Sequence, residues 1–211
     1  FPMNILVFNF GSYIHSDLLF FLQKAGHHCK SIMYKFQNLY EDAFFEKRFS
    51  YYLKNANYDC VISTNFFPLI AKLCYENSIK YLAWSYDSPI SRSHLEYYAY
   101  PTNFIFLFDR DEVIFFHEQG LENFYHLPLA VNTIRLSSIK PSAKEIERYS
   151  CDISFIGQFY QSPLKDLLLL QDDYTKGYIN AIADAQFRVY GYNFVSELIS
   201  DSIIEKMNLN Y

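Results

Sequence analysis

Short apolar segments alternate with segments of helical periodicity up to about residue 130, and this alternation constrains the fold more than any other feature of the sequence. The apolar segments are the expected strands, at residues 4–10, 29–34, 59–64, 79–85, 103–108 and 123–127. The expected helices between them lie at residues 18–25, 40–57, 68–77 and 111–119. Parallel strands need crossovers of about a dozen residues or more, usually helices. The sequence therefore predicts an α/β fold with a doubly wound, parallel, Rossmann-like sheet.

A polar segment at residues 133–150 divides the sequence into two parts. It contains Pro141 and alternating lysine and glutamate residues, which is typical of a linker. We expect residues 3–132 to form one domain before it. Residues 151–211 are expected to hold strands at 152–157 and 187–191 and helices at 163–170, 174–185 and 194–207. Because about 60 residues with two strands do not easily close a core, this part is expected to be a truncated second domain or a helical extension.

Charge, hydropathy and cysteine spacing exclude several classes of function. The net charge is −5 and no basic run is present, so neither a nucleic-acid partner nor a polybasic membrane patch is predicted. No apolar run approaches the roughly 20 residues of a membrane span. The four cysteines form no C-x-x-C pair, so no metal site is predicted and free thiols in a reducing compartment are expected. These features predict a cytoplasmic protein, either free or at the inner face of the membrane.

Three of the apolar segments run into polar tips, and these tips predict where a ligand binds. They cover residues 84–89, 104–110 and 124–132. Parallel α/β sheets bind ligands where their strands end. Asp87, beside Tyr86 and Pro89, is a candidate base that accepts a proton from an attacking hydroxyl if burial raises its pKa. An Asx-turn or a helix cap is the alternative role for this carboxylate.

The segment after the first expected strand offers a second set of candidates. Gly11 is either a turn glycine or part of a loop that lines a ligand cleft. Dinucleotide binding is disfavoured because the segment has no G-x-G-x-x-G pattern. His15 is a second candidate base, and a structural histidine at a helix start is the alternative.

Two further loops carry groups that suit phosphates or sugar hydroxyls. Arg110 follows the fifth expected strand and presents a forked set of donors, while Asp109 either joins it in binding or caps the next helix. The loop with Gly157, Gln158 and Tyr160 follows the expected strand at 152–157, where backbone N–H groups can hold a diphosphate.

Four segments together resemble the bacterial CgeB-like glycosyltransferases in order and spacing. They are Tyr86–Pro89, Phe106–Arg110, His126–Val131 and Asp152–Gly157. The resemblance implies the N-terminal portion of a GT-B enzyme, in which one Rossmann-like domain receives an acceptor and a second holds a nucleotide-sugar. It also implies metal-independent sugar transfer in bacterial glycan or glycoprotein assembly. Against the pattern of such enzymes, we expect that most of the second domain is absent, and therefore that the chain is inactive by itself.

The resemblance and the polar tips together give a set of candidate site residues. The catalytic candidates are Asp87 and His15, and the substrate-binding candidates are Asn9, Gly11, Asn65, Tyr86, Ser88, Asp109 and Arg110. The nucleotide-sugar-binding candidates are Gly157, Gln158 and Tyr160. The expected partners are a glycan or glycoconjugate acceptor and a nucleotide-sugar co-substrate, with no cofactor and no metal. A non-catalytic module that binds a small molecule, or a scaffold in glycan assembly, is the alternative function.

Overall fold

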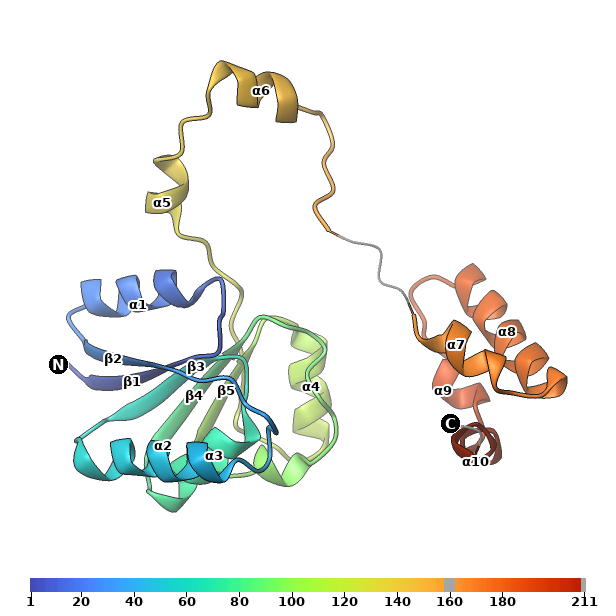
Figure 1. Ribbon diagram of the computed structural model, residues 1–211, viewed down its shortest axis with the longest axis horizontal. Coiled ribbons are helices and arrows are strands. Elements are labelled where there is room, and N and C mark those ends of the chain that lie inside the picture. Colours follow the sequence, from blue (N-terminus) through green and yellow to red (C-terminus); the bar gives the residue numbers. More distant parts are fainter. Residues whose placement is uncertain (158–161, 210–211) are drawn as a thin grey trace. The chain divides into compact units, whose positions relative to one another are not determined.

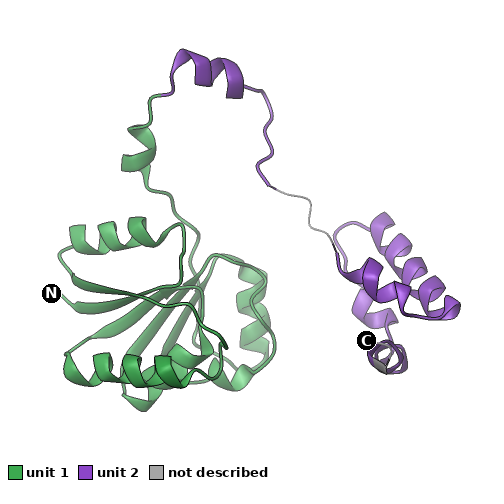
Figure 2. Cartoon of the chain, in the orientation of Figure 1, with its two compact units in different colours: residues 1–140 green, residues 141–211 purple. Residues whose placement is uncertain are grey.

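The computed structural model describes residues 1–157 and 162–209. The chain divides into two compact units, Phe1–Lys140 and Pro141–Tyr211 (Figure 2). The boundary between them falls inside the segment that was expected to be a linker. No helix among the described residues has the length and the apolar character that crossing a membrane requires.

The first unit is built on a parallel sheet of six strands, which confirms the predicted α/β, doubly wound fold (Figure 1). The strand order is β2-β1-β3-β4-β5-β6. The strands are β1 (Asn4–Asn9), β2 (His28–Met33), β3 (Cys60–Thr64), β4 (Lys80–Ser85), β5 (Asn103–Leu107) and β6 (Phe124–His126). The order reverses between β1 and β3, and the carboxyl ends of the strands at such a reversal are where folds of this kind bind ligands.

Helices cover both faces of this sheet. The helices of the unit are α1 (His15–Lys24), α2 (Ala43–Asn55), α3 (Pro68–Glu76), α4 (Arg110–Glu118) and α5 (Thr133–Ser137), with a short 3-10 turn η1 (Leu95–Tyr97) before β5. Figure 1 shows α1 on the opposite face of the sheet from α2 and α3. On the α2 and α3 side, Phe8 and Tyr81 are fully buried among Phe45, Phe49 and Leu69. This packing fixes the strand ends that carry the candidate site.

The described residues of the second unit contain helices and no strand. These helices are α6 (Ala143–Tyr149), α7 (Leu164–Leu169), α8 (Asp173–Arg188), α9 (Val195–Leu198) and α10 (Asp201–Leu209). The helix expected at 194–207 is therefore divided into α9 and α10, and Ile199 is the C-cap of α9. α8 runs three residues further than expected, through Phe187 to Arg188.

The two strands expected in the second unit are wrong. Ile153 and Ile156 are 91% and 96% exposed, and the segment at 152–157 pairs with no described strand. The segment at 187–191 begins inside α8, and Phe187 is 93% exposed. A short apolar run becomes a strand only where a neighbouring strand takes up its backbone groups, and no such neighbour is present among the described residues.

Candidate functional site

Asn65 ties the carboxyl end of β3 to that of β4. It follows Thr64 with φ 70°, a left-handed conformation that asparagine tolerates better than most residues. Its side-chain oxygen accepts hydrogen bonds from the N–H groups of Tyr86 (3.0 Å) and Asp87 (3.3 Å). Its amide nitrogen donates to the Asp87 carboxylate at 2.6 Å. One side chain thus sets both the backbone after β4 and the orientation of the candidate base.

A buried hydroxyl pair supports this turn from beneath. The Tyr81 hydroxyl lies 2.6 Å from the Ser63 hydroxyl and accepts a hydrogen bond from the N–H of Phe67 at 3.0 Å. Ser63 in turn donates to the carbonyl of Asn65 at 2.6 Å. Burial raises the pKa of Tyr81 well above its usual value, so its hydroxyl stays protonated and can donate to Ser63.

Glu112 fixes the loop after β4 from the side of α4. Its side chain is buried, with the residue 5% exposed. One carboxylate oxygen accepts from the N–H of Ile90 at 2.9 Å and the other from the hydroxyl of Ser88 at 2.7 Å. Glu112 was not singled out from the sequence. The available signal was its position four residues before buried Phe116, on the same side of the helix.

These contacts form one wall of a pocket of about 170 Å³ at the carboxyl ends of β3 and β4. The pocket is lined by Leu39, Tyr40, Asn65, Phe66, Pro68, Ser85, Asp87, Pro89, Ile90, Ser91, Ser93, His94, Tyr97 and Tyr98. The ring of Tyr40 lies 4.7 Å from that of His94 and 5.5 Å from that of Tyr97, between centroids. Apolar ring faces beside an amide and a carboxylate suit a ligand that is flat on one side and carries hydroxyl groups.

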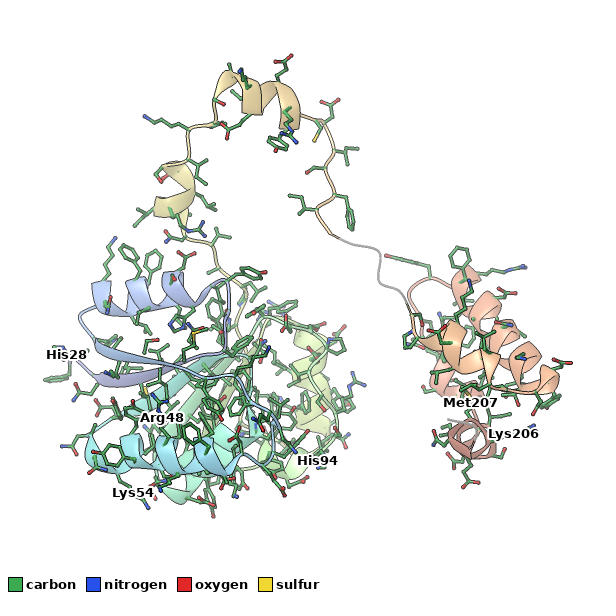
Figure 3. All side chains as sticks on the ribbon, in the orientation of Figure 1. His28, Arg48, Lys54, His94, Lys206 and Met207 are labelled. Atoms are coloured by element: carbon green, nitrogen blue, oxygen red, sulfur yellow. The ribbon has the colours of Figure 1, made fainter. Side chains whose placement is uncertain are left out.

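His94 also lines this pocket and was not among the residues considered from the sequence. It adopts a left-handed backbone conformation with φ 58°, which is uncommon for a residue other than glycine. Its Nδ1 lies 3.2 Å from a carboxylate oxygen of Glu96. Figure 3 shows His94 on the side of the first unit where the strands end, away from His28, the first residue of β2. No periodic pattern in the polar segment before β5 distinguished this histidine.

The loop after β1 serves mainly its own turn. The side-chain oxygen of Asn9 accepts from the N–H of Gly11 at 2.8 Å, and Gly11 takes φ +100°, which requires glycine. The ring of Phe10 stacks on that of Tyr86 at 6.5 Å. Tyr86 therefore packs toward the end of β1, and neither Tyr86 nor Gly11 lines the pocket.

The tip of β5 is a helix cap. The Asp109 carboxylate accepts from the N–H of Asp111 at 2.8 Å, the geometry expected at the start of α4. Arg110 is the first residue of that helix and is exposed. Neither residue lines the pocket, so the structure does not bring them to Asp87.

His15 lies apart from the pocket. It is 6% exposed, and its Nε2 is 2.9 Å from the hydroxyl of Ser31 on β2. Burial lowers the pKa of His15. In the sheet, β2 and β4 are separated by β1 and β3, which corresponds to about 14 Å at about 4.8 Å per neighbouring pair. The two candidate bases are therefore not brought together.

The expected diphosphate loop is only partly described. Gln158 and Tyr160 lie outside the described residues. Gly157 ends the extended segment that forms no strand, and a side chain there would meet the ring of Phe155 at 2.8 Å. Among the described residues, no three histidine, cysteine or acidic side chains are grouped as a metal site requires.

Comparisons with known proteins give little further guidance. No protein-family model and no curated protein matches the sequence, so the resemblance to CgeB-like glycosyltransferases rests on the quoted segments. Among solved structures, the chain is similar to the L780 UDP-rhamnose synthase from Acanthamoeba polyphaga mimivirus, with 15% sequence identity and a TM-score of 0.31. This match covers 40% of the chain and 37% of the synthase.

Proposed function

We propose that residues 3–132 are the acceptor-binding domain of a CgeB-like, GT-B glycosyltransferase. The observation that carries the proposal is the aromatic pocket at the carboxyl ends of β3 and β4, where Asn65 holds the Asp87 carboxylate on one wall. Sugars bind by stacking their apolar faces on aromatic rings while their hydroxyls hydrogen-bond to amides and carboxylates. Both kinds of group line this pocket.

Each pocket residue has a role under this proposal. Tyr40 and Tyr97 provide the stacking surface. The Asp87 carboxylate is exposed, so the burial on which its role as a base depended is absent, and it accepts a hydrogen bond from a sugar hydroxyl. Asn65 holds Asp87 in place through the 2.6 Å hydrogen bond that its amide donates. Ser88 acts indirectly, because its hydroxyl is bound to Glu112.

The rest of the proposal concerns the partner substrate. Residues 133–150 would link the acceptor domain to residues 151–211, which would bind the nucleotide-sugar through Gly157, Gln158 and Tyr160. Arg110, which is exposed after β5, would contribute from the neighbouring strand end. The enzyme would work in the bacterial cytoplasm, or at the inner face of the membrane.

Saturation-transfer difference NMR on the full chain tests the acceptor pocket. The probes are a panel of neutral and acidic monosaccharides and disaccharides, with UDP-sugars and GDP-sugars as a second panel. We expect saturation of sugar protons, and we expect it to disappear in Asp87→Ala and in Tyr40→Ala. Asp109→Asn is the matched control, because this carboxylate follows the next strand and lies outside the pocket. Signals that survive both pocket variants would overturn the site assignment.

One observation favours a non-catalytic binding module as the second candidate. All residues that line the pocket lie between Leu39 and Tyr98, so the pocket is complete within the first unit. The two functions are distinguished by incubating a longer chain with nucleotide-sugars and a sugar that binds the pocket. Release of a nucleoside diphosphate favours the transferase. Tight sugar binding without release of a nucleoside diphosphate favours the module.

A further inference from the structure

Strand β2 is an edge of the sheet with unpaired backbone groups. Its neighbour β1 lies on one side. There the N–H of His28 donates to the carbonyl of Met3 at 2.8 Å, and the N–H of Tyr34 donates to the carbonyl of Asn9 at 3.1 Å. Because backbone groups alternate along a parallel strand, those of Cys29, Ser31 and Met33 point away from the sheet. Their N–H groups donate to no described residue. Such an edge is a template for another strand.

A groove runs beside this edge, between β2 and α2. It has a volume of about 180 Å³ and is lined by Lys30, Ser31, Ile32, Met33, Tyr34, Phe45, Arg48, Phe49 and Tyr52. Phe45 and Phe49 are buried at 2% and 1% exposure and provide an apolar base. Met33, at the rim, is 70% exposed. The groove therefore offers side-chain contacts next to the open backbone edge.

The charge of the groove is positive, although the whole chain carries −5. Lys30 and Arg48 both line it, and neither forms an ion pair with a described residue. Of the nearby acidic groups, Glu46 pairs with Lys72, while Asp42 accepts from Tyr34, caps α2 and keeps its negative charge. An anionic occupant would thus meet two cations that are not engaged in an ion pair with a described residue.

We propose that β2 and this groove bind an extended acidic peptide segment of a partner protein, which adds to the sheet as a further strand. Main-chain hydrogen bonds to Cys29, Ser31 and Met33 would give affinity, and Lys30 and Arg48 would select acidic side chains. Charge disfavours a second copy of this chain, because antiparallel pairing of two β2 strands would bring their Lys30 side chains close together. The proposal is independent of the pocket at β3 and β4.

Fluorescence anisotropy with the full chain tests this proposal. The probe is a labelled ten-residue peptide of alternating threonine and glutamate, and the control peptide alternates threonine and lysine. We expect the acidic peptide to bind more weakly as salt increases, and the basic peptide not to bind.

Two pairs of variants separate backbone pairing from charge. Met33→Pro removes one outward N–H at an edge position that tolerates proline, and we expect about a tenfold loss of affinity, whereas Met33→Ala keeps the N–H and most of the affinity. Arg48→Glu should cost about tenfold or more, while Lys54→Glu, on the same helix but outside the groove, should change affinity by less than about twofold. Figure 3 shows Arg48 and Lys54 on α2.

Three outcomes would overturn the proposal. Absence of binding by the acidic peptide in low salt would do so directly. Binding that Met33→Pro leaves unchanged would exclude strand addition. Concentration-dependent dimers in sedimentation, lost in Met33→Pro, would identify a second copy as the occupant. Circular dichroism of each variant confirms that the fold is intact before affinity is compared.

Discussion

The strand ends of the first unit fall into two groups with different hydrogen bonds. The loop after β4 is held by Asn65, which follows β3, and by Glu112 of α4, and both bind residues more than 20 positions away in the sequence. At β1 and β5, Asn9 and Asp109 accept hydrogen bonds from N–H groups only two positions further on. A polar residue after a strand therefore helps to build a pocket when its partner belongs to a different element. When its partner is local, it serves its own turn.

Asn65→Ala should have the largest effect, because it removes the link between two strand ends. Three hydrogen bonds are lost, and alanine is strained at φ 70°. We expect a loss of about 3 kcal/mol in the free energy of unfolding, measured by urea denaturation. Asn65→Gly removes the same hydrogen bonds without the strain and should lose about 1 kcal/mol less. An equal loss of unfolding free energy in both variants would show that the left-handed conformation costs alanine no stability.

Glu112→Ala should have the second largest effect. Alanine removes both hydrogen bonds, so the N–H of Ile90 and the hydroxyl of Ser88 lose their acceptor. Since the site is buried, we expect a loss of about 2 kcal/mol. Hydrogen exchange gives the specific readout, because the amide of Ile90 should lose protection while that of Phe116 in the same helix keeps it. Unchanged exchange at Ile90 would contradict the assigned role of Glu112.

The six strands could be predicted from the sequence because buried parallel strands are nearly continuous apolar runs. β3 is buried at all five positions, and its residues were recognised within one position. The same rule failed at 152–157 and 187–191, since an apolar run does not reveal whether a neighbouring strand exists. It also could not identify Glu112 or His94 as site residues, because their importance depends on which loops the fold brings together.

Asp109→Ala tests the local group and should have a moderate effect. It removes the cap of α4, so we expect a loss of about 1 kcal/mol in the free energy of unfolding. The pocket should keep its ligand, because Asp109 does not line it. Asp87→Asn is the matched variant at the other strand end. It should weaken sugar binding and cost less stability than Asp109→Ala, since it keeps one oxygen that can accept from Asn65. Loss of sugar binding in Asp109→Ala would mean that the strand ends with local hydrogen bonds also contribute to the pocket.

His15, in the helix after β1, should give the smallest effect, visible only as a dependence on pH. Its folded pKa is lowered by burial, whereas the unfolded value is 6.5. Below pH 6.5 the unfolded chain binds a proton that the folded chain does not, so the free energy of unfolding falls until the pH reaches the folded pKa. Thermal melts at pH 7.5 and pH 5.5 should show a smaller fall for His15→Gln than for the unmodified chain. An equal fall in both proteins would mean that His15 titrates alike in the folded and unfolded states, and that the 2.9 Å contact with Ser31 compensates its burial.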